Sequence, residues 1–186
     1  MGRLIYSAMQ SLDGYVADAA GKFDWAEPDE AVHRFANQLQ RPIGTNLLGR
    51  RMYEVMSAWE TLGVQGDEPD YVVEFSELWR ASEKIVYSTT LTSVSGARTR
   101  LERAFDPDAI RLMKNESEAD ISISGPTLAA HAIADGLIDE YQLFVVPAIV
   151  GGGLRSLPEG IRLDLQLIDQ RRFANGTIYV SYRPAE

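Results

Sequence analysis

Four segments of the sequence have the composition of a ligand-binding junction, and the first of them is "SISGPT". There an apolar stretch ends at Gly125, and Pro126 and Thr127 begin a stretch with helical spacing. The first turn of a helix leaves backbone N–H groups unpaired, and the helix dipole favours a negative charge beside them. Glycine has no Cβ, so an anion can approach this backbone closely. A strand-to-helix turn without any ligand would have the same composition.

The second segment, "LLGRRMYE", places two cations at the start of a helical stretch. Gly49 ends an apolar run, and Arg50 and Arg51 follow it directly. A guanidinium group binds a phosphate through two parallel hydrogen bonds, so this pair can supply the local positive charge that an acidic protein needs for such a ligand. Two surface arginines on a helix are the alternative interpretation.

Glycines and hydroxyl groups follow two further apolar runs. The stretch "VVPAIVGGG" ends in Gly151–Gly153, which would let the backbone pass close to a flat or charged ligand or would form a flexible loop. The stretch "YSTTL" places Ser88 and Thr89 after another apolar run. Neither G-x-G-x-x-G nor G-x-x-x-x-G-K-[ST] occurs, so the Rossmann fingerprint and the P-loop are both excluded.

Alternating strands and helices are expected to bring these segments together. The hydrophobic patterns predict strands over residues 3–8, 45–49, 84–88, 120–124 and 140–150, and helices over residues 28–40, 50–56, 70–82, 106–116 and 126–135. This order predicts an α/β fold with a mixed, mostly parallel sheet and helices on both of its faces. Ligands bind such sheets at the carboxyl ends of the strands, where the segments above lie.

Caps and turns give more local predictions. Pro28 is expected near the start of its helix, and Asp106 is expected to cap the helix that Pro107 begins. Residues 162–173 and 177–183 alternate in polarity and predict an antiparallel hairpin, with Asn175-Gly176 as a type I′ turn.

Length and charge exclude several classes of protein. The 186 residues suffice for one domain, over residues 1–186. The net charge is −9 and no basic stripe is present, which argues against a nucleic-acid partner. No apolar run approaches the roughly 20 residues that cross a bilayer, and the N-terminus lacks the pattern of a signal peptide. We therefore expect a cytoplasmic protein without a membrane partner.

Metal chemistry is not expected either. The sequence contains no cysteine, which excludes disulfides, thiolate zinc sites and a cysteine nucleophile. His33 and His131 lie far apart, and neither has a second histidine at ligand spacing, so both are interpreted as histidines on a helix or at the surface.

The ordered set of motifs resembles the dihydrofolate reductase-like superfamily. The stretches "SLDGYVA", "LLGRRMYEVM", "YSTTL", "SISGPTLAAHAI" and "IDEYQLFVVPAIVGGG" carry the resemblance, which covers nearly the whole chain. The chain is most similar to the branch typified by the reductase domain of the bifunctional riboflavin-biosynthesis deaminase-reductase. The deaminase half of that enzyme needs a cysteine-containing zinc site, so this cysteine-free chain corresponds to the reductase part alone.

The resemblance implies about eight strands in the sheet and NADPH as the cofactor. By position, the cofactor phosphates would lie near Gly49, Arg50 and Arg51, and the adenosine 2′-phosphate near Ser88 and Thr89. The pyrophosphate-binding turn and a neighbouring glycine-rich turn would comprise Ser124, Gly125, Pro126, Thr127 and Leu128, and Gly151, Gly152 and Gly153. The arginines favour NADPH over NADH because the additional phosphate needs cationic partners.

The same resemblance implies where the substrate lies. Residues 11–14, "SLDG", match the loop beside the nicotinamide and substrate, with Ser11 as a substrate contact. Asp13 is the catalytic acid in this interpretation, or a residue that caps the turn before Gly14. Trp25 resembles the tryptophan of the folate-reductase active-site loop.

A second candidate acid follows from the same comparison. Glu30, or Asp29, occupies the place of the carboxylate that protonates the substrate in folate reductases. Alternatively, it only complements the helix dipole. Tyr53, together with the neighbouring large apolar residues, would line a flat pocket or belong to the core.

These implications predict a hydride transfer from NADPH to a carbonyl or C=N group of a small polar heterocycle. The substrate of the riboflavin route, 5-amino-6-(5-phosphoribosylamino)uracil, is the first candidate. The alternatives are a dihydrofolate or pterin reductase and a non-catalytic nucleotide-binding homodimer. A homodimer is expected in either case, because members of the superfamily often form one.

Overall fold

The structure is a computed structural model, and it describes residues 1–64 and 66–185. Residues 65 and 186, which the predicted domain includes, lie outside the described residues. The described strands are β1 (Leu4–Ser11), β2 (Tyr15–Asp18), β3 (Ile43–Gly49), β4 (Glu83–Tyr87), β5 (Thr99–Glu102), β6 (Asp120–Ser124), β7 (Glu140–Val146), β8 (Gly153–Arg155), β9 (Leu165–Arg172) and β10 (Ile178–Pro184). The helices are α1 (Glu30–Gln40), α2 (Arg50–Met56), α3 (Asp70–Ala81), α4 (Pro107–Glu116) and α5 (Pro126–Ala134), with short 3-10 turns η1 (Asp24–Ala26) and η2 (Ser57–Glu60).

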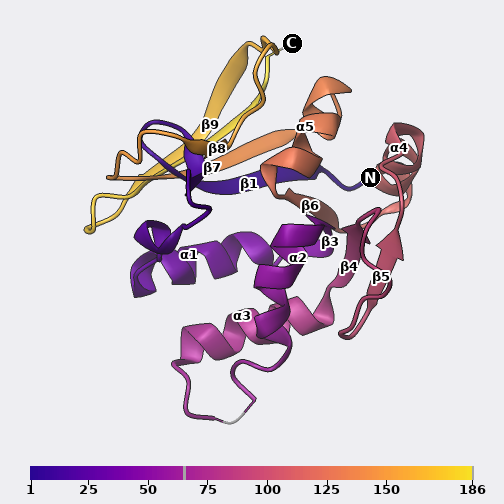
Figure 1. Ribbon diagram of the computed structural model, residues 1–186, viewed down its shortest axis with the longest axis horizontal. Coiled ribbons are helices and arrows are strands. Elements are labelled where there is room, and N and C mark those ends of the chain that lie inside the picture. The colour runs from indigo at the N-terminus through magenta and orange to yellow at the C-terminus, as the bar shows by residue number, and fades with distance from the viewer. Residues whose placement is uncertain (65, 186) are drawn as a thin grey trace.

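One large sheet joins strands from both ends of the chain. Within the described residues it has eight strands in the order β5-β4-β3-β6-β1-β7-β10-β9. All neighbours pair in parallel except β10, which runs antiparallel to both β7 and β9. The prediction of a mixed, mostly parallel sheet with a C-terminal antiparallel hairpin is confirmed (Figure 1).

Helices cover both faces of this sheet, as the alternating pattern predicted. On one face, α4 and α5 pack on the largest apolar cluster, which includes Tyr6, Ile110 and Ile133. On the other face lie α1, α2 and α3, seen below the sheet in Figure 1. The parallel strands begin at the same edge, so their carboxyl ends meet at the opposite edge, where the glycine-rich junctions lie.

The prediction of a strand over 140–150 is wrong at its end. β7 stops at Val146 because Pro147 has no N–H to continue the ladder. The chain then turns, and Ala148 accepts a hydrogen bond from the Leu12 N–H (2.7 Å). The sequence patterns also missed three short strands, β2, β5 and β8, because each has only three or four residues. β2 and β8 form a separate two-stranded sheet beside the end of β1.

The type I′ turn is also corrected. Such a turn needs a positive φ at both central residues. Gly176 has φ 89°, but among the described non-glycine residues only Arg98 has a positive φ, so Asn175 does not. The Gly176 N–H donates to the Phe173 carbonyl (3.1 Å) and the Phe173 N–H to the Thr177 carbonyl (2.9 Å). This pattern is a three-residue loop that ends in a glycine bulge.

Helix caps explain the helix starts. Asp106 accepts a hydrogen bond from the Asp108 N–H (3.0 Å), and Pro107 begins α4, as predicted. α1 begins later than expected, at Glu30, because Asp29 is the capping residue and accepts from the Val32 N–H (2.9 Å). Pro28 therefore precedes the helix, and Asp29 stabilises the start of α1 as its N-terminal cap.

Candidate functional site

A pocket of about 590 Å³ lies at the carboxyl ends of β3, β4 and β6. It collects three of the predicted segments, although they are far apart in sequence. Most of the predicted cofactor residues line it, namely Gly49, Arg50, Arg51, Ser88, Thr89, Gly125, Pro126, Thr127 and Leu128. The remaining lining residues, which were not among the predicted cofactor contacts, are Met52, Tyr87, Thr90, Arg103, Phe105, His131 and Leu154.

The turn between β6 and α5 forms one wall of the pocket. Gly125 has φ 91°, a conformation that side chains with a Cβ rarely adopt, and Pro126 occupies the first turn of the helix. No side chain caps α5. Its first-turn N–H groups and the positive end of its dipole therefore remain available to an anion in the pocket. On its inner side Leu128 and Ala129 are buried, which fixes the helix against the sheet.

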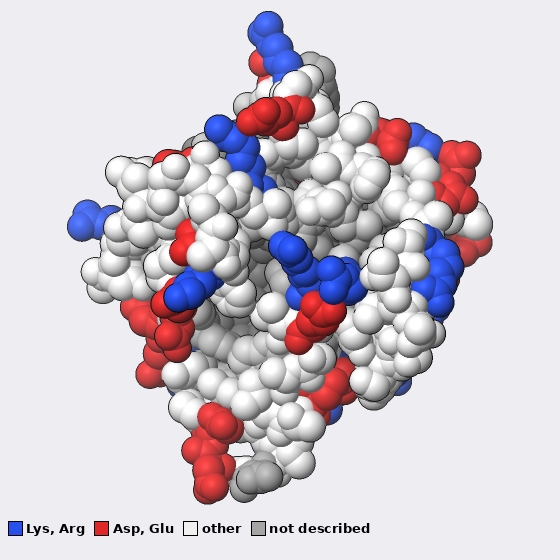
Figure 2. All heavy atoms as spheres, viewed as in Figure 1, with Lys and Arg blue, Asp and Glu red and all other residues white. Residues whose placement is uncertain are grey.

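Three arginines give this acidic protein a basic spot at the pocket. Arg50 and Arg51 begin α2, and Arg103 follows β5. The Arg50 guanidinium approaches the Glu54 carboxylate (3.2 Å), whereas Arg51 and Arg103 form no ion pair within the described residues. Figure 2 shows a group of basic side chains over the start of α2, beside a hollow in the surface.

Arg103 also holds the loop that follows β4. Its Nη1 donates to the carbonyl oxygens of Ser88 (3.1 Å) and Leu91. The Ser88 hydroxyl accepts from the N–H groups of Thr90 (3.2 Å) and Leu91 (3.1 Å), so it stabilises the turn from within. The exposed Thr89 hydroxyl lies at the pocket. No sequence motif indicated Arg103 as a site residue, because only the pairing of β5 with β4 brings it to this edge of the sheet.

A flat aromatic surface forms the far end of the pocket. The rings of Phe105 and His131 stack with their centroids 5.8 Å apart and their planes at 26°. Tyr87 packs on Phe105 at 5.8 Å. Such a surface suits a planar base, because stacking needs only a flat π-face. His131 lies on the exposed side of α5, as predicted, but it faces this pocket.

Four predicted cofactor residues do not line the pocket, and three of them are the consecutive glycines. The Gly151 N–H donates to the Asp13 carboxylate (2.8 Å). Gly153 pairs with Asp18 in the β2–β8 sheet, and a Cβ there would lie 2.1 Å from the Ala17 carbonyl oxygen. Gly153 therefore allows close contact between β8 and β2, whereas a Cβ at Gly151 or Gly152 would meet no atom within 4 Å. The fourth residue, Ser124, ends β6.

Asp13 ties the β1–β2 turn to the loop after β7. Its carboxylate accepts from the N–H groups of Gly151 and Val150 (2.8 and 3.2 Å). A hydrogen bond from the Ser11 hydroxyl, together with these two, holds the pKa of Asp13 below its usual range. The fully buried Ser11 hydroxyl also accepts from the Tyr15 N–H (3.0 Å). An ionised carboxylate does not donate a proton, so this geometry suits positioning better than acid catalysis.

The structure does not bring Glu30, Trp25 or Tyr53 to the pocket. The Glu30 side chain is 61% exposed and pairs with Arg34 on the next turn of α1 (2.8 Å). Trp25 lies in η1, and its indole donates to the Lys22 carbonyl, which precedes η1 (3.2 Å). Tyr53 is buried in the core under α2 and α3, where its hydroxyl accepts from the Ser95 N–H (2.8 Å).

The described residues contain no group of three or more metal-ligating side chains. Nor does any helix among them have the length and apolar character that a membrane crossing requires.

Known proteins share both the sequence pattern and this fold. The sequence matches the RibD C-terminal domain over residues 3–179. An uncharacterized protein of Bacillus subtilis (strain 168), YyaP, is 26% identical over 183 residues, which are 97% of this chain and 94% of YyaP. A crystal structure from Shewanella sp. PV-4, of a protein whose name refers to riboflavin biosynthesis, has a TM-score of 0.76 at 21% identity and covers 99% of both chains.

Two further structures carry enzyme names. The deaminase/5-amino-6-(5-phosphoribosylamino)uracil reductase of Thermotoga maritima has a TM-score of 0.67 at 14% identity, and the match covers 99% of this chain and 57% of that one. The dihydrofolate reductase of Enterococcus faecalis, complexed with NADP(H), has a TM-score of 0.63 at 12% identity over 100% and 98% of the two chains. At these identities the likeness is one of fold.

Proposed function

Because this chain belongs to the RibD C-terminal domain family, we propose that it is an NADPH-dependent reductase of a small polar heterocycle. The first candidate substrate is 5-amino-6-(5-phosphoribosylamino)uracil. The observation that carries the proposal is the pocket at the carboxyl edge of the sheet, where three arginines, an uncapped helix start and an aromatic surface meet. The family membership confirms the resemblance in sequence and fold, and the lining of the pocket supports the proposed cofactor.

The residues of the pocket fit the parts of NADPH. The N–H groups of α5 after Gly125 would hold the pyrophosphate, and Arg50, Arg51 and Arg103 would hold the phosphate groups by charge-assisted hydrogen bonds. The stacked rings of Phe105 and His131 would support the adenine base. When bound, NADPH supplies a hydride from carbon 4 of its nicotinamide ring.

The protein contributes placement more than acid–base chemistry. Asp13 and Ser11 fix the β1–β2 turn against the loop after β7, which shapes the edge of the sheet next to the pocket. Asp13 is held ionised, and Glu30 faces solvent in its pair with Arg34. Solvent is therefore the proton source in our proposal, and the catalytic task of this chain is to orient two bound molecules.

Titration of the purified protein with NADPH and NADH, followed by cofactor fluorescence, tests the proposal first. We expect NADPH to bind at least about 100-fold more tightly than NADH, because only NADPH carries the phosphate that the arginines can pair with. If neither cofactor binds, the reductase assignment is wrong. NADPH oxidation with 5-amino-6-(5-phosphoribosylamino)uracil then tests the substrate.

Two other results would redirect the assignment. Turnover of dihydrofolate would indicate a pterin-type reductase, although the outward Glu30 argues against it. NADPH binding without oxidation across pyrimidine, pterin and carbonyl substrates would indicate a non-catalytic nucleotide-binding protein.

The proposal includes a homodimer and a cytoplasmic location. β9 is an edge strand, and all eight of its residues are exposed. It presents three apolar side chains, Leu165, Leu167 and Ile168. An apolar edge of this kind is a surface for association with a second copy. Cell fractionation tests the location.

Leu167→Asp is expected to convert the dimer to a monomer. The substitution places a charge within the apolar edge strand, which association would have to desolvate. Sedimentation equilibrium of wild type and variant measures the change, and Leu112→Asp, an exposed leucine on α4, is the matched control. A monomeric wild-type protein would contradict the dimer.

A further inference from the structure

Two walls of the pocket have little stability of their own. The first is α2, which presents Arg50 and Arg51 but has only seven residues and no side-chain cap at its start. Helices of this length are not stable in isolation. The second is the segment 88–98 between β4 and β5, which presents Thr89, contains no helix or strand and is mostly exposed. Contacts with the rest of the protein must therefore fix both walls.

Tyr53 joins these two walls to each other. It follows Arg51 closely in α2, and its ring is buried in the apolar cluster that also contains Trp79. Its hydroxyl accepts a hydrogen bond from the Ser95 N–H (2.8 Å) and donates one to the Ser95 carbonyl (3.1 Å). The hydroxyl thus uses both its donor and its acceptor function on the backbone of the segment 88–98. These bonds fix the separation between the helix and the segment.

Glu60 forms a second connection between the same parts of the chain. It lies in η2, directly after α2, and its carboxylate accepts from the Ala97 N–H (3.4 Å) and the Trp79 indole (3.0 Å). The same carboxylate pairs with Lys84 (3.3 Å), whose side chain is fully buried and needs this partner for its charge. Gly96 lets the segment come this close, since a Cβ at that position would lie 2.8 Å from Glu60 Oε1.

The segment 88–98 transmits its position to the pocket. Leu91 and Val94 pack against the cluster that contains Tyr53. Arg103 Nη1 donates to the carbonyl oxygens of Ser88 (3.1 Å) and Leu91, which closes the turn that lines the pocket. The pocket turn and the part of the segment that contacts α2 and η2 are therefore held as one unit.

We infer that Tyr53 and Glu60 are positioning residues, which hold α2 and the segment 88–98 at the separation that a phosphate group between them requires. This inference rests on the proposed function and deepens it. Neither residue lines the pocket, so neither acts by touching the cofactor. Charge-assisted hydrogen bonds need about 2.7–2.9 Å between their heavy atoms, so a small shift of either wall removes a phosphate contact. Walls that are fixed in advance also do not have to be ordered when the cofactor binds.

Fluorescence titration of Tyr53→Phe with NADPH and NADH tests the inference, because this substitution removes only the hydroxyl group. We expect NADPH binding to weaken about 10-fold, which corresponds to one lost hydrogen bond, and NADH binding to stay within about twofold of wild type. NADH lacks the additional phosphate, so its affinity depends less on the separation of these walls. Glu60→Gln, which removes the charge and keeps the shape of the side chain, should change the two affinities in the same way.

Two further variants separate positioning from a general loss of stability. Arg3→Ala is the matched control, because Arg3 lies at the amino edge of the sheet, away from the pocket. It should lower the melting temperature and leave the ratio of NADPH to NADH affinity unchanged. In protein that already carries Arg50→Gln and Arg51→Gln, Tyr53→Phe should weaken NADPH binding by less than about twofold, because the arginines that it positions are gone.

The outcomes distinguish the inference from the proposed function. If wild-type protein binds neither cofactor, or binds both equally well, the proposed NADPH site fails, and the inference fails with it. If wild type prefers NADPH and either variant keeps that preference in full, the reductase proposal stands and the positioning role of that residue is overturned. An equal loss from Tyr53→Phe with and without the two arginines also overturns its role, because Tyr53 would then act on the fold as a whole.

Discussion

Replacing Arg50 and Arg51 together with glutamine is expected to weaken NADPH binding about 100-fold or more. Each guanidinium is expected to make a charge-assisted hydrogen bond to a phosphate, and two such bonds are worth about 3 kcal/mol. Both side chains are exposed at the pocket, so their loss should not unfold the protein. Fluorescence titration with NADPH and NADH measures the effect, and NADH affinity should fall far less.

The control for this prediction must carry the same change in net charge. Arg162 and Arg172 are exposed and do not line the pocket, so Arg162→Gln with Arg172→Gln changes the overall charge equally. NADPH binding by this control should stay within about twofold of wild type, since distant surface charges are screened. An equal loss in both double variants would mean that overall charge, and not the pocket, attracts the cofactor.

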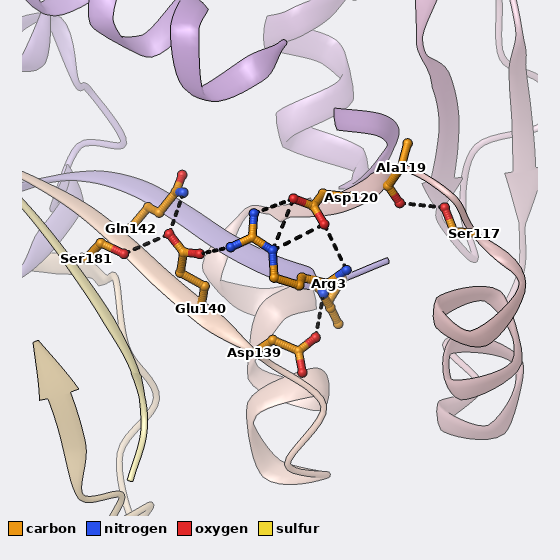
Figure 3. A network of polar contacts seen from close by, with 9 residues as sticks. Arg3, Ser117, Ala119, Asp120, Asp139, Glu140, Gln142 and Ser181 are labelled. Carbon is orange, nitrogen blue, oxygen red and sulfur yellow. Dashed lines mark hydrogen bonds and ion pairs between the residues drawn. The ribbon is translucent and has the colours of Figure 1, made fainter. Parts of the chain in front are cut away.

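Arg3→Ala is expected to destabilise the protein by about 2 kcal/mol. Arg3 joins the amino ends of three strands, because it contacts Asp120 at the start of β6 (2.5 Å) and Glu140 at the start of β7 (2.6 Å) (Figure 3). The Glu140 side chain is only 9% exposed, and without Arg3 its charge would be left buried without a cation. The Arg3 side chain is itself 53% exposed, so the expected loss of stability is smaller than the 3–5 kcal/mol that is typical of breaking a fully buried pair.

Thermal unfolding measures this loss as a fall of about 4–8 °C in the melting temperature. Arg111→Ala is the matched control, because Arg111 pairs with Asp108 only at the surface of α4, and we expect a change within about 0.5 kcal/mol. The double variant Arg3→Met with Glu140→Gln removes both charges and should recover part of the stability. A single variant as stable as wild type would contradict the role of the network.

The same network predicts a dependence on pH. Burial raises the pKa of Asp120, but hydrogen bonds from Arg3 lower it by more, so the pKa lies below the ordinary value of 3.8. A lowered pKa stabilises the folded state above the ordinary value, and this contribution is lost as the pH falls through the lowered one. Wild-type protein should therefore lose stability to urea below about pH 4, and Arg3→Ala should lose less over the same range.

The sequence alone was sufficient for the fold class. Alternating apolar strands and amphipathic helices require a layered sheet, and right-handed crossovers make most of its strands parallel. The glycine and arginine junctions at Gly49 and Gly125 were identified because strand ends in such a sheet share one edge. The short strands β2, β5 and β8 were not predicted, because three or four residues are too few to show a hydrophobic period.

Only the tertiary structure decided which residues share the site. Arg103 carries no motif, and it reaches the pocket because β5 pairs with β4. The three glycines after β7 resemble a ligand-binding turn, but they lie outside the pocket, where the Gly151 N–H donates to Asp13 and Gly153 packs closely against β2. Local pattern encodes secondary structure because its period is set by neighbouring residues. The partner of a glycine or a carboxylate is set by a segment more than a hundred residues away, and the chain must fold before that partner is determined.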